Sequence, residues 1–223
     1  MKNLNLFLST GWLMSAWTLY SLAVVLALYK FPWRSLRDSR VVQHLFLGLT
    51  FAVALLWLMR VAIYPGLEVH FLGATVLTLM FGWPMALVST AIAGVGSVFF
   101  SDVNIAAYGI YGVIRGVVPV LVSFSIFKLT DWYLPKHFFI YMFVNCFFGA
   151  GIAVFISSFF LIGALWLSAS YPLSFLYSEY FVYLPLIMFP EALITGMVMT
   201  GMMVYHPDWI KTFDSAAYLD DNK

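Results

Sequence analysis

The sequence predicts an all-α protein, a polytopic membrane helix bundle of about seven transmembrane helices with the N-terminus outside and the C-terminus in the cytoplasm. Hydrophobic residues make up 63% of the 223 residues and charged residues 9%. Soluble domains are about 45–50% apolar and roughly 25% charged. The apolar residues also gather in long runs, and a crossing takes about 20 residues. No linker or repeat divides the chain, so we expect a single integral membrane domain over residues 1–223.

Seven apolar runs are the expected spans. The third run is short for a crossing, so we expect it to be tilted, broken or partly re-entrant. Pro84 begins the fourth run, since proline is well tolerated in the first turn of a helix. The runs are Gly11–Tyr29, Val41–Ile63, Val69–Phe81, Pro84–Phe100, Ile105–Phe127, His137–Ser168 and Glu179–Tyr205.

Lysine and arginine gather in alternate loops, and this sets the predicted orientation. Four lie between residues 30 and 40, two between 128 and 136, and two in the tail, whereas the intervening loops have none. Cytoplasmic loops carry the excess of basic residues, and Lys2 is the one dissenting charge. The alternation indicates that the third run crosses. It also places on the outer face a set of polar groups that we expect to line one outward-facing pocket: Glu68, His70, Asp102, Glu179 and the first residues of the chain.

Arg115 and Glu191 fall near the middle of the fifth and seventh runs, where charge is costly and usually paired. We therefore expect an intramembrane ion pair that fixes helix register; the alternative is a gate or a substrate contact. Gly109, Gly112 and Gly116 put small residues on one face of the fifth run, a pattern that favours close helix approach.

Several function classes lack their sequence signals. The net charge of +1 gives no basic footprint, so we expect the lipid bilayer and not nucleic acid as a partner. The chain has no Gly-x-x-x-x-Gly-Lys-Ser/Thr phosphate loop, no Gly-x-Ser-x-Gly elbow and no His-Glu-x-x-His motif. We therefore expect a transport subunit that is not an enzyme, with any ATP hydrolysed by a partner. A membrane redox or haem-binding subunit that uses His44 and His137 remains an alternative.

Four stretches resemble, in order, those of one transporter family. The chain is similar to the permease, or substrate-capture subunit, of the cobalt/nickel energy-coupling-factor (ECF) ABC transporters of the bacterial inner membrane. The family's Gly-Pro-Trp turn is here Gly-Trp-Pro. The stretches are FLSTGWLMSAW at Phe7–Trp17, HFLGATVLTLMFGWPMALV at His70–Val88, FSDVNIAAYG at Phe100–Gly109 and PEALITGMVMTGMMVYHPDWI at Pro190–Ile210.

The resemblance implies that the chain captures a divalent transition metal, nickel or cobalt, as a transported substrate. It also implies a transmembrane coupling subunit and cytoplasmic ATPases as partners. In the metal-binding members, the terminal amine, a backbone nitrogen, a second-position histidine and a later histidine surround the ion. Such planar nitrogen ligation suits Ni(II) or Cu(II). The later histidine matches His70, and the metal-binding candidates are His70, Glu68, Asp102 and the terminal amine of Met1.

The chain departs from this family at two places. Position 2 is Lys2, whose protonated ammonium has no lone pair and repels a cation. Tyr111 and Ile114 replace the asparagines usual after the aspartate turn, with Arg115 beside them. These changes keep open a second possibility, namely that the same scaffold carries a different small solute.

Overall fold

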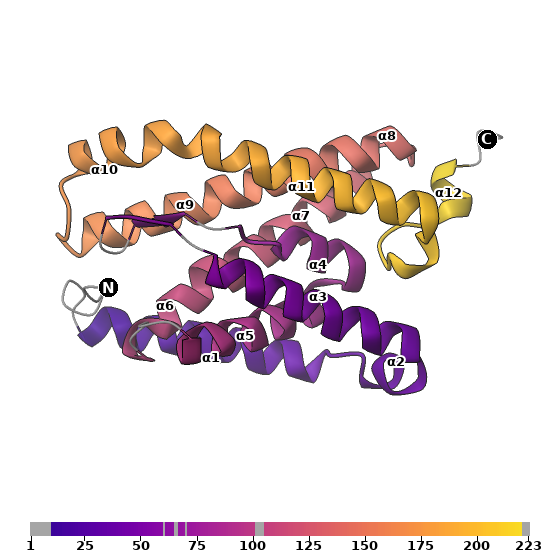
Figure 1. The fold of residues 1–223 in the computed structure, drawn as a ribbon, viewed down its shortest axis with the longest axis horizontal. Coiled ribbons are helices and arrows are strands. Elements are labelled where there is room, and N and C mark those ends of the chain that lie inside the picture. The colour runs from indigo at the N-terminus through magenta and orange to yellow at the C-terminus, as the bar shows by residue number, and fades with distance from the viewer. Residues whose placement is uncertain (1–9, 60, 65–66, 70, 101–104, 220–223) are drawn as a thin grey trace.

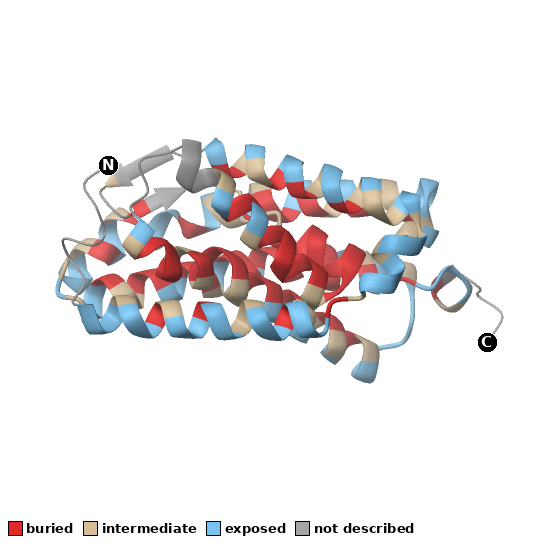
Figure 2. Ribbon diagram, turned by 90° about the horizontal axis from the view of Figure 1, so that it is seen from below, coloured by how far each residue is buried: buried red, intermediate tan, exposed pale blue. Residues whose placement is uncertain are grey.

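The computed structural model describes residues 10–59, 61–64, 67–69, 71–100 and 105–219. The long helices lie side by side along one axis, and successive segments run between the two ends of the bundle (Figure 1). We call the end with the β1–β2 hairpin and α10 the hairpin end, and the end with α2, α8 and α12 the tail end. Buried residues gather along the middle of the bundle (Figure 2). The predicted all-α membrane bundle is confirmed.

Within the described part of the chain, five helical segments are long and apolar enough to cross a membrane. Two are single helices, α1 (Thr10–Tyr29) and α3 (Arg40–Leu58). The other three combine several elements. They are Ile105–Tyr133 with η2 (Ile105–Ala107), α6 (Tyr108–Gly112), η3 (Val113–Val117) and α7 (Val118–Tyr133); Phe138–Leu167 with α8 (Phe138–Ile140), η4 (Tyr141–Phe148) and α9 (Gly149–Leu167); and Leu173–Tyr205 with α10 (Leu173–Glu179), η5 (Phe181–Tyr183) and α11 (Leu184–Tyr205).

The predicted second run extends too far. Helix α3 ends at Leu58, and the chain then forms an antiparallel hairpin of β1 (Val61–Tyr64) and β2 (Leu67–Val69). The fourth run is helix α5 (Trp83–Phe100), with Pro84 in its first turn as expected. The shorter elements at the tail end are α2 (Trp33–Asp38), η6 (Pro207–Trp209) and α12 (Ser215–Leu219).

The third run is not a continuous helix. Only α4 (Ala74–Phe81) is helical, and its 8 residues span about 12 Å, whereas the hydrocarbon core is about 30 Å thick. All eight residues of α4 are buried in the bundle. Its last turn reaches the tail end, where the Lys211 N–H donates to the Met80 carbonyl at 2.9 Å. The described part of this run therefore ends in a short helix whose last turn lies at the tail end.

Close approach of α6 to α1 follows from glycine, as the sequence predicts. A Cβ atom at Gly109 would lie 2.8 Å from the Trp17 backbone nitrogen, so a side chain there requires the helices to separate. The Trp17 indole N–H donates to the Ala106 carbonyl at 3.1 Å and adds a polar contact to this junction. The fifth predicted run is thus anchored against the first.

The charged residues are distributed unequally between the two ends. The described lysines and arginines other than Arg115 all belong to segments at the tail end, around α2, the α7–α8 connection and the loop before α12 (Figure 1). This matches the alternation seen in the sequence. The number of crossings and the side of the membrane that the tail end faces stay predictions.

Candidate functional site

Glu191 holds the start of the half-helix α4 in place. It follows Pro190 inside α11 and is 4% exposed. Its Oε2 accepts the Leu72 N–H at 2.9 Å, and its Oε1 accepts the Gly73 N–H at 2.8 Å. A helix that begins inside the bundle has backbone N–H groups with no helical partner, and a carboxylate at its N-terminus satisfies them and complements the helix dipole. Glu191 thus fixes the non-helical residues that precede α4 in the third run.

The sequence around the break suits this geometry. Gly73 has a φ of +63°, which side chains disfavour, and a Cβ there would lie 2.9 Å from Val53 Cγ2. The Trp57 indole N–H donates to the Leu72 carbonyl at 3.0 Å, so both polar groups of the Leu72 backbone have partners. In the first turn of α4, the Thr75 hydroxyl lies 2.8 Å from the Ser123 hydroxyl and connects α4 to α7. The interrupted chain is therefore fixed by α3, α7 and α11 together.

Arg115 and Trp57 line the same small cavity. Arg115 is 5% exposed, and its guanidinium carbon lies 4.5 Å from the centroid of the Tyr111 ring, a cation–π distance. The cavity measures about 10 Å³, room for about one water molecule. Its lining combines aromatic and small polar residues with Arg115: Tyr20, Trp57, Thr90, Gly94, Tyr108, Tyr111, Gly112 and Gly116.

Two tyrosines that line this cavity, Tyr20 and Tyr108, contact each other and are backed by Trp17. The Tyr20 and Tyr108 hydroxyls lie 3.3 Å apart, and their rings meet edge to face with centroids 5.6 Å apart. Trp17 packs against both rings. Since every ring comes from α1 or α6, the junction between these helices forms part of the wall of the cavity. Sequence reasoning singled out Arg115 but missed these tyrosines, whose only signal is a hydroxyl-bearing residue inside an apolar run.

At the hairpin end, Tyr64 ties the hairpin to α10. Its hydroxyl donates to Glu179 Oε2 at 3.1 Å, and its ring lies 5.0 Å from that of Phe175. The hydrogen bond to the Glu179 carboxylate, together with the negative charge of that group, raises the pKa of Tyr64. The sequence predicts Glu179 on the outer face with the metal candidates. In the structure its hydrogen bond to Tyr64 holds strand β1 of the hairpin against α10.

The metal candidates of the sequence lie mostly beyond the described part of the chain. His70, Asp102 and Met1 fall outside the described residues, and Glu68 is described only as a backbone position in β2. Among the described residues no group of three or more His, Cys, Asp or Glu side chains has a metal-binding arrangement. The metal site therefore stays a prediction.

The intramembrane ion pair also stays a prediction. Both carboxylate oxygens of Glu191 accept backbone N–H groups, and Arg115 lies against Tyr111, with Trp57 and Leu72 connecting the two neighbourhoods.

The two histidines of the haem alternative are exposed at the tail end. His44 is on the outside of α3, and His137 Nδ1 accepts the Phe139 N–H at 3.2 Å.

A membrane helix bundle with a half-helix whose N-terminus is buried inside it is an architecture typical of transporters. Residues 5–209 match the family described as the cobalt uptake substrate-specific transmembrane region. The chain belongs to this family, which confirms the resemblance found in the sequence.

Two solved structures have the same fold. One is a truncated transition metal transporter, with a TM-score of 0.73 and 18% identity over 90% of this chain and 97% of that chain. The other is a transition metal transporter, with a TM-score of 0.71 and 20% identity over 89% of this chain and 90% of that chain. At these identities the likeness concerns the fold alone. No curated protein sequence gives a significant match.

Proposed function

We propose that this chain is the substrate-capture permease subunit of an ECF-type transporter that takes up a transition metal ion, cobalt or nickel, as its cargo. The observation that carries the proposal is the family match, which extends over residues 5–209 and so includes nearly the whole chain. The fold shared with two transition metal transporters supports it. The chain then acts as one domain in the bacterial inner membrane, and its N-terminus lies outside.

The contacts of Glu191 support a role for His70. His70 precedes Leu72 by two residues, and the Leu72 and Gly73 backbone is held by Glu191 and Trp57. A ligand binds a metal more tightly when the surrounding structure fixes its position in advance. In the proposal, Glu191 and Trp57 orient the chain that carries His70, and Glu68, Asp102 and the terminal amine of Met1 complete the donor set. Metal approaches from the hairpin end.

The energy for uptake comes from partners in this proposal. The sequence has no phosphate-binding loop of the Gly-x-x-x-x-Gly-Lys-Ser/Thr type, so cytoplasmic ATPases hydrolyse ATP and a transmembrane coupling subunit transmits the change. The basic segments of the tail end are the cytoplasmic surface in this arrangement. The chain itself performs no chemical conversion.

One observation favours a second candidate, a different small solute on the same scaffold. Arg115 places a buried guanidinium beside the cavity lined by Tyr20 and Tyr108. A positive side chain near a solute path disfavours a bare cation unless a counter-charge accompanies it. Lys2 adds a second positive charge where the metal-binding members have histidine.

Purification of the full chain from native membranes tests both candidates. We expect cobalt or nickel at about one ion per chain in elemental analysis, and co-purification of a membrane subunit and ATPases. A sample that is free of metal after growth in cobalt and nickel, but that carries an organic anion identified by mass spectrometry, contradicts metal uptake and supports the second candidate. A chain that retains metal but never captures ATPases contradicts the ECF-type coupling.

A further inference from the structure

A groove of about 630 Å³ separates α2 from the first turns of α3 at the tail end. It lies at the opposite end of the bundle from the β1–β2 hairpin (Figure 1), and the proposed transport function does not use it. Its polar lining residues are Arg34, Arg37 and Gln43. Its apolar lining residues are Trp33, Leu36, Phe46 and Leu47. The groove therefore offers positive charge and apolar surface side by side.

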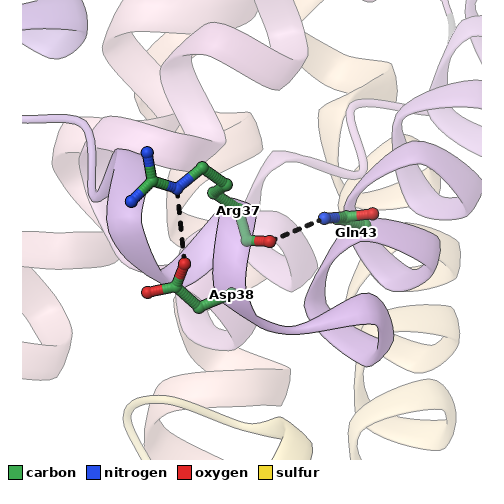
Figure 3. A network of polar contacts seen from close by, with 3 residues as sticks. All are labelled: Arg37, Asp38 and Gln43. Carbon is green, nitrogen blue, oxygen red and sulfur yellow. Dashed lines mark hydrogen bonds and ion pairs between the residues drawn. The ribbon is translucent and has the colours of Figure 1, made fainter.

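Hydrogen bonds across the α2–α3 corner hold the groove open. Gln43 Nε2 donates to the Arg37 carbonyl at 3.2 Å and ties α3 to the end of α2 (Figure 3). The Ser39 hydroxyl accepts the Val42 N–H at 3.3 Å and starts α3. The Trp33 indole N–H donates to the Leu28 carbonyl at 3.2 Å and ties α2 to the end of α1. The two arginines therefore project from a fixed corner.

The corner has an excess of positive charge. Residues 30–40 contain four basic side chains against the single acid Asp38, a net charge of +3. Arg37 Nε lies 3.4 Å from Asp38 Oδ1, but both side chains are highly exposed, and such pairs contribute little to stability. The Nη groups of Arg37 point away from Asp38 (Figure 3). Guanidinium groups of this kind bind phosphate oxygens through paired hydrogen bonds.

Exposed apolar side chains continue from the groove along α3. Leu47 is 62% exposed, Phe51 65% and Leu55 46%, and their spacing of four residues places them on one helix face. Leu47 lines the groove, so this stripe begins where the arginines are. This arrangement matches a phospholipid, whose negatively charged phosphate meets the positive charge and whose acyl chain then lies along the exposed apolar surface.

We propose that the α2–α3 groove binds an anionic phospholipid. The phosphate lies between Arg34 and Arg37, and one acyl chain lies against Leu47 and continues along Phe51 and Leu55. Basic pockets next to membrane helices on the cytoplasmic side bind anionic headgroups, and each basic residue near the surface adds about 1 kcal/mol. The lipid is favoured over a protein helix because the arginines stand at the end of the apolar stripe and not along it.

Native mass spectrometry of the full chain in detergent, with dioleoylphosphatidylglycerol or dioleoylphosphatidylcholine added, tests the proposal. We expect the wild type to prefer the anionic lipid at least tenfold. The double variant Arg34→Gln/Arg37→Gln should lose about 10- to 30-fold in affinity for it. The control is Arg40→Gln, which removes one positive charge next to the groove but none from its lining. It should change the affinity by less than about twofold.

Each other outcome counts against the lipid site. Equal binding of the two lipids, or equal loss in the Arg40→Gln control, overturns it. Competition by inorganic phosphate at millimolar concentration assigns the groove to a free anion, and displacement of the lipid by a co-purified subunit assigns it to a protein partner. If the double variant does not fold, Leu47→Ser replaces it. This exposed substitution should weaken the anionic lipid about threefold, and an unchanged affinity contradicts the acyl-chain contact.

Discussion

Two charges are buried to almost the same degree inside this bundle, and their surroundings differ. Glu191 is 4% exposed and binds two backbone N–H groups at the start of α4, whereas Arg115 is 5% exposed and lies against the Tyr111 ring beside a cavity. Both carboxylate oxygens of Glu191 thus have backbone hydrogen-bond partners. Arg115 lies against an aromatic ring beside a cavity of about 10 Å³, whereas Glu191 also lines a larger cavity of about 140 Å³. The comparison indicates that neither burial nor a neighbouring cavity alone identifies a functional charge, and that the hydrogen-bond partners must be examined.

The largest expected effect comes from Glu191→Ala. This change leaves the Leu72 and Gly73 N–H groups buried without an acceptor, and each such group costs about 1–3 kcal/mol. We expect a loss of about 3 kcal/mol in unfolding free energy, measured by denaturant titration in detergent. Glu191→Gln retains one acceptor and should lose about half as much. Glu179→Ala removes a half-buried carboxylate that accepts one hydroxyl group and no backbone N–H in the described contacts, and a loss there as large as in Glu191→Ala contradicts the proposed difference.

Gly73→Ala should be next in size. The φ of +63° costs an alanine about 1–2 kcal/mol, and the added Cβ meets Val53 Cγ2 at 2.9 Å. We expect a loss of about 2 kcal/mol in the same titration. Gly48→Ala in α3 is the control, since nothing lies within 4 Å of its Cβ and alanine favours the helix. A tolerated Gly73→Ala means that the break before α4 does not depend on this conformation.

A double-mutant cycle decides whether the two charges interact. The variants are Glu191→Gln, Arg115→Met and their combination. Because Glu191 is satisfied by backbone groups, we expect a coupling energy below about 0.5 kcal/mol. A coupling above about 1 kcal/mol, with the double variant more stable than Glu191→Gln alone, supports the ion pair predicted from the sequence and removes the contrast between the two sites.

The smallest effect is expected at Tyr64. Its pKa is raised by the hydrogen bond to Glu179, so the bond stabilises the fold below the ordinary tyrosine pKa of about 10 and is lost as pH rises above it. As pH rises above the ordinary tyrosine pKa of about 10, the melting temperature of the wild type should therefore fall more than that of Tyr64→Phe. Parallel curves for the two proteins contradict the contact between the hairpin and α10.

Hydropathy and charge alone predicted most of the fold. The apolar runs that became α1, the Ile105–Tyr133 segment and the Phe138–Leu167 segment were placed within a few residues of most of their ends, because a bilayer requires long apolar stretches. The break in the third run was only hinted at by its length. Leu72, Gly73 and Ala74 read as apolar helix, and the positive φ that ends this pattern depends on contacts with α3 and α11.

The candidate site was less accessible to sequence reasoning. A carboxylate in a span suggests a charged partner, and Arg115 was the available cation, but backbone N–H groups exposed by a broken helix leave no trace in composition. Trp57 is the only tryptophan in α3, but its type alone does not indicate its hydrogen-bond partner. Its bond to the Leu72 carbonyl joins residues that are 15 positions apart, and this contact follows only from the path of the hairpin.

The central claim is that His70 binds the transported metal ion, and a metal titration tests it most directly. Isothermal titration of the purified full chain with Co²⁺ or Ni²⁺ should show one site in the wild type. His70→Ala should weaken it by at least about 100-fold, since a metal ligand is lost. His44→Ala, which removes an exposed histidine at the tail end, should bind like the wild type. Equal affinity in His70→Ala and the wild type contradicts metal capture by the inherited histidine.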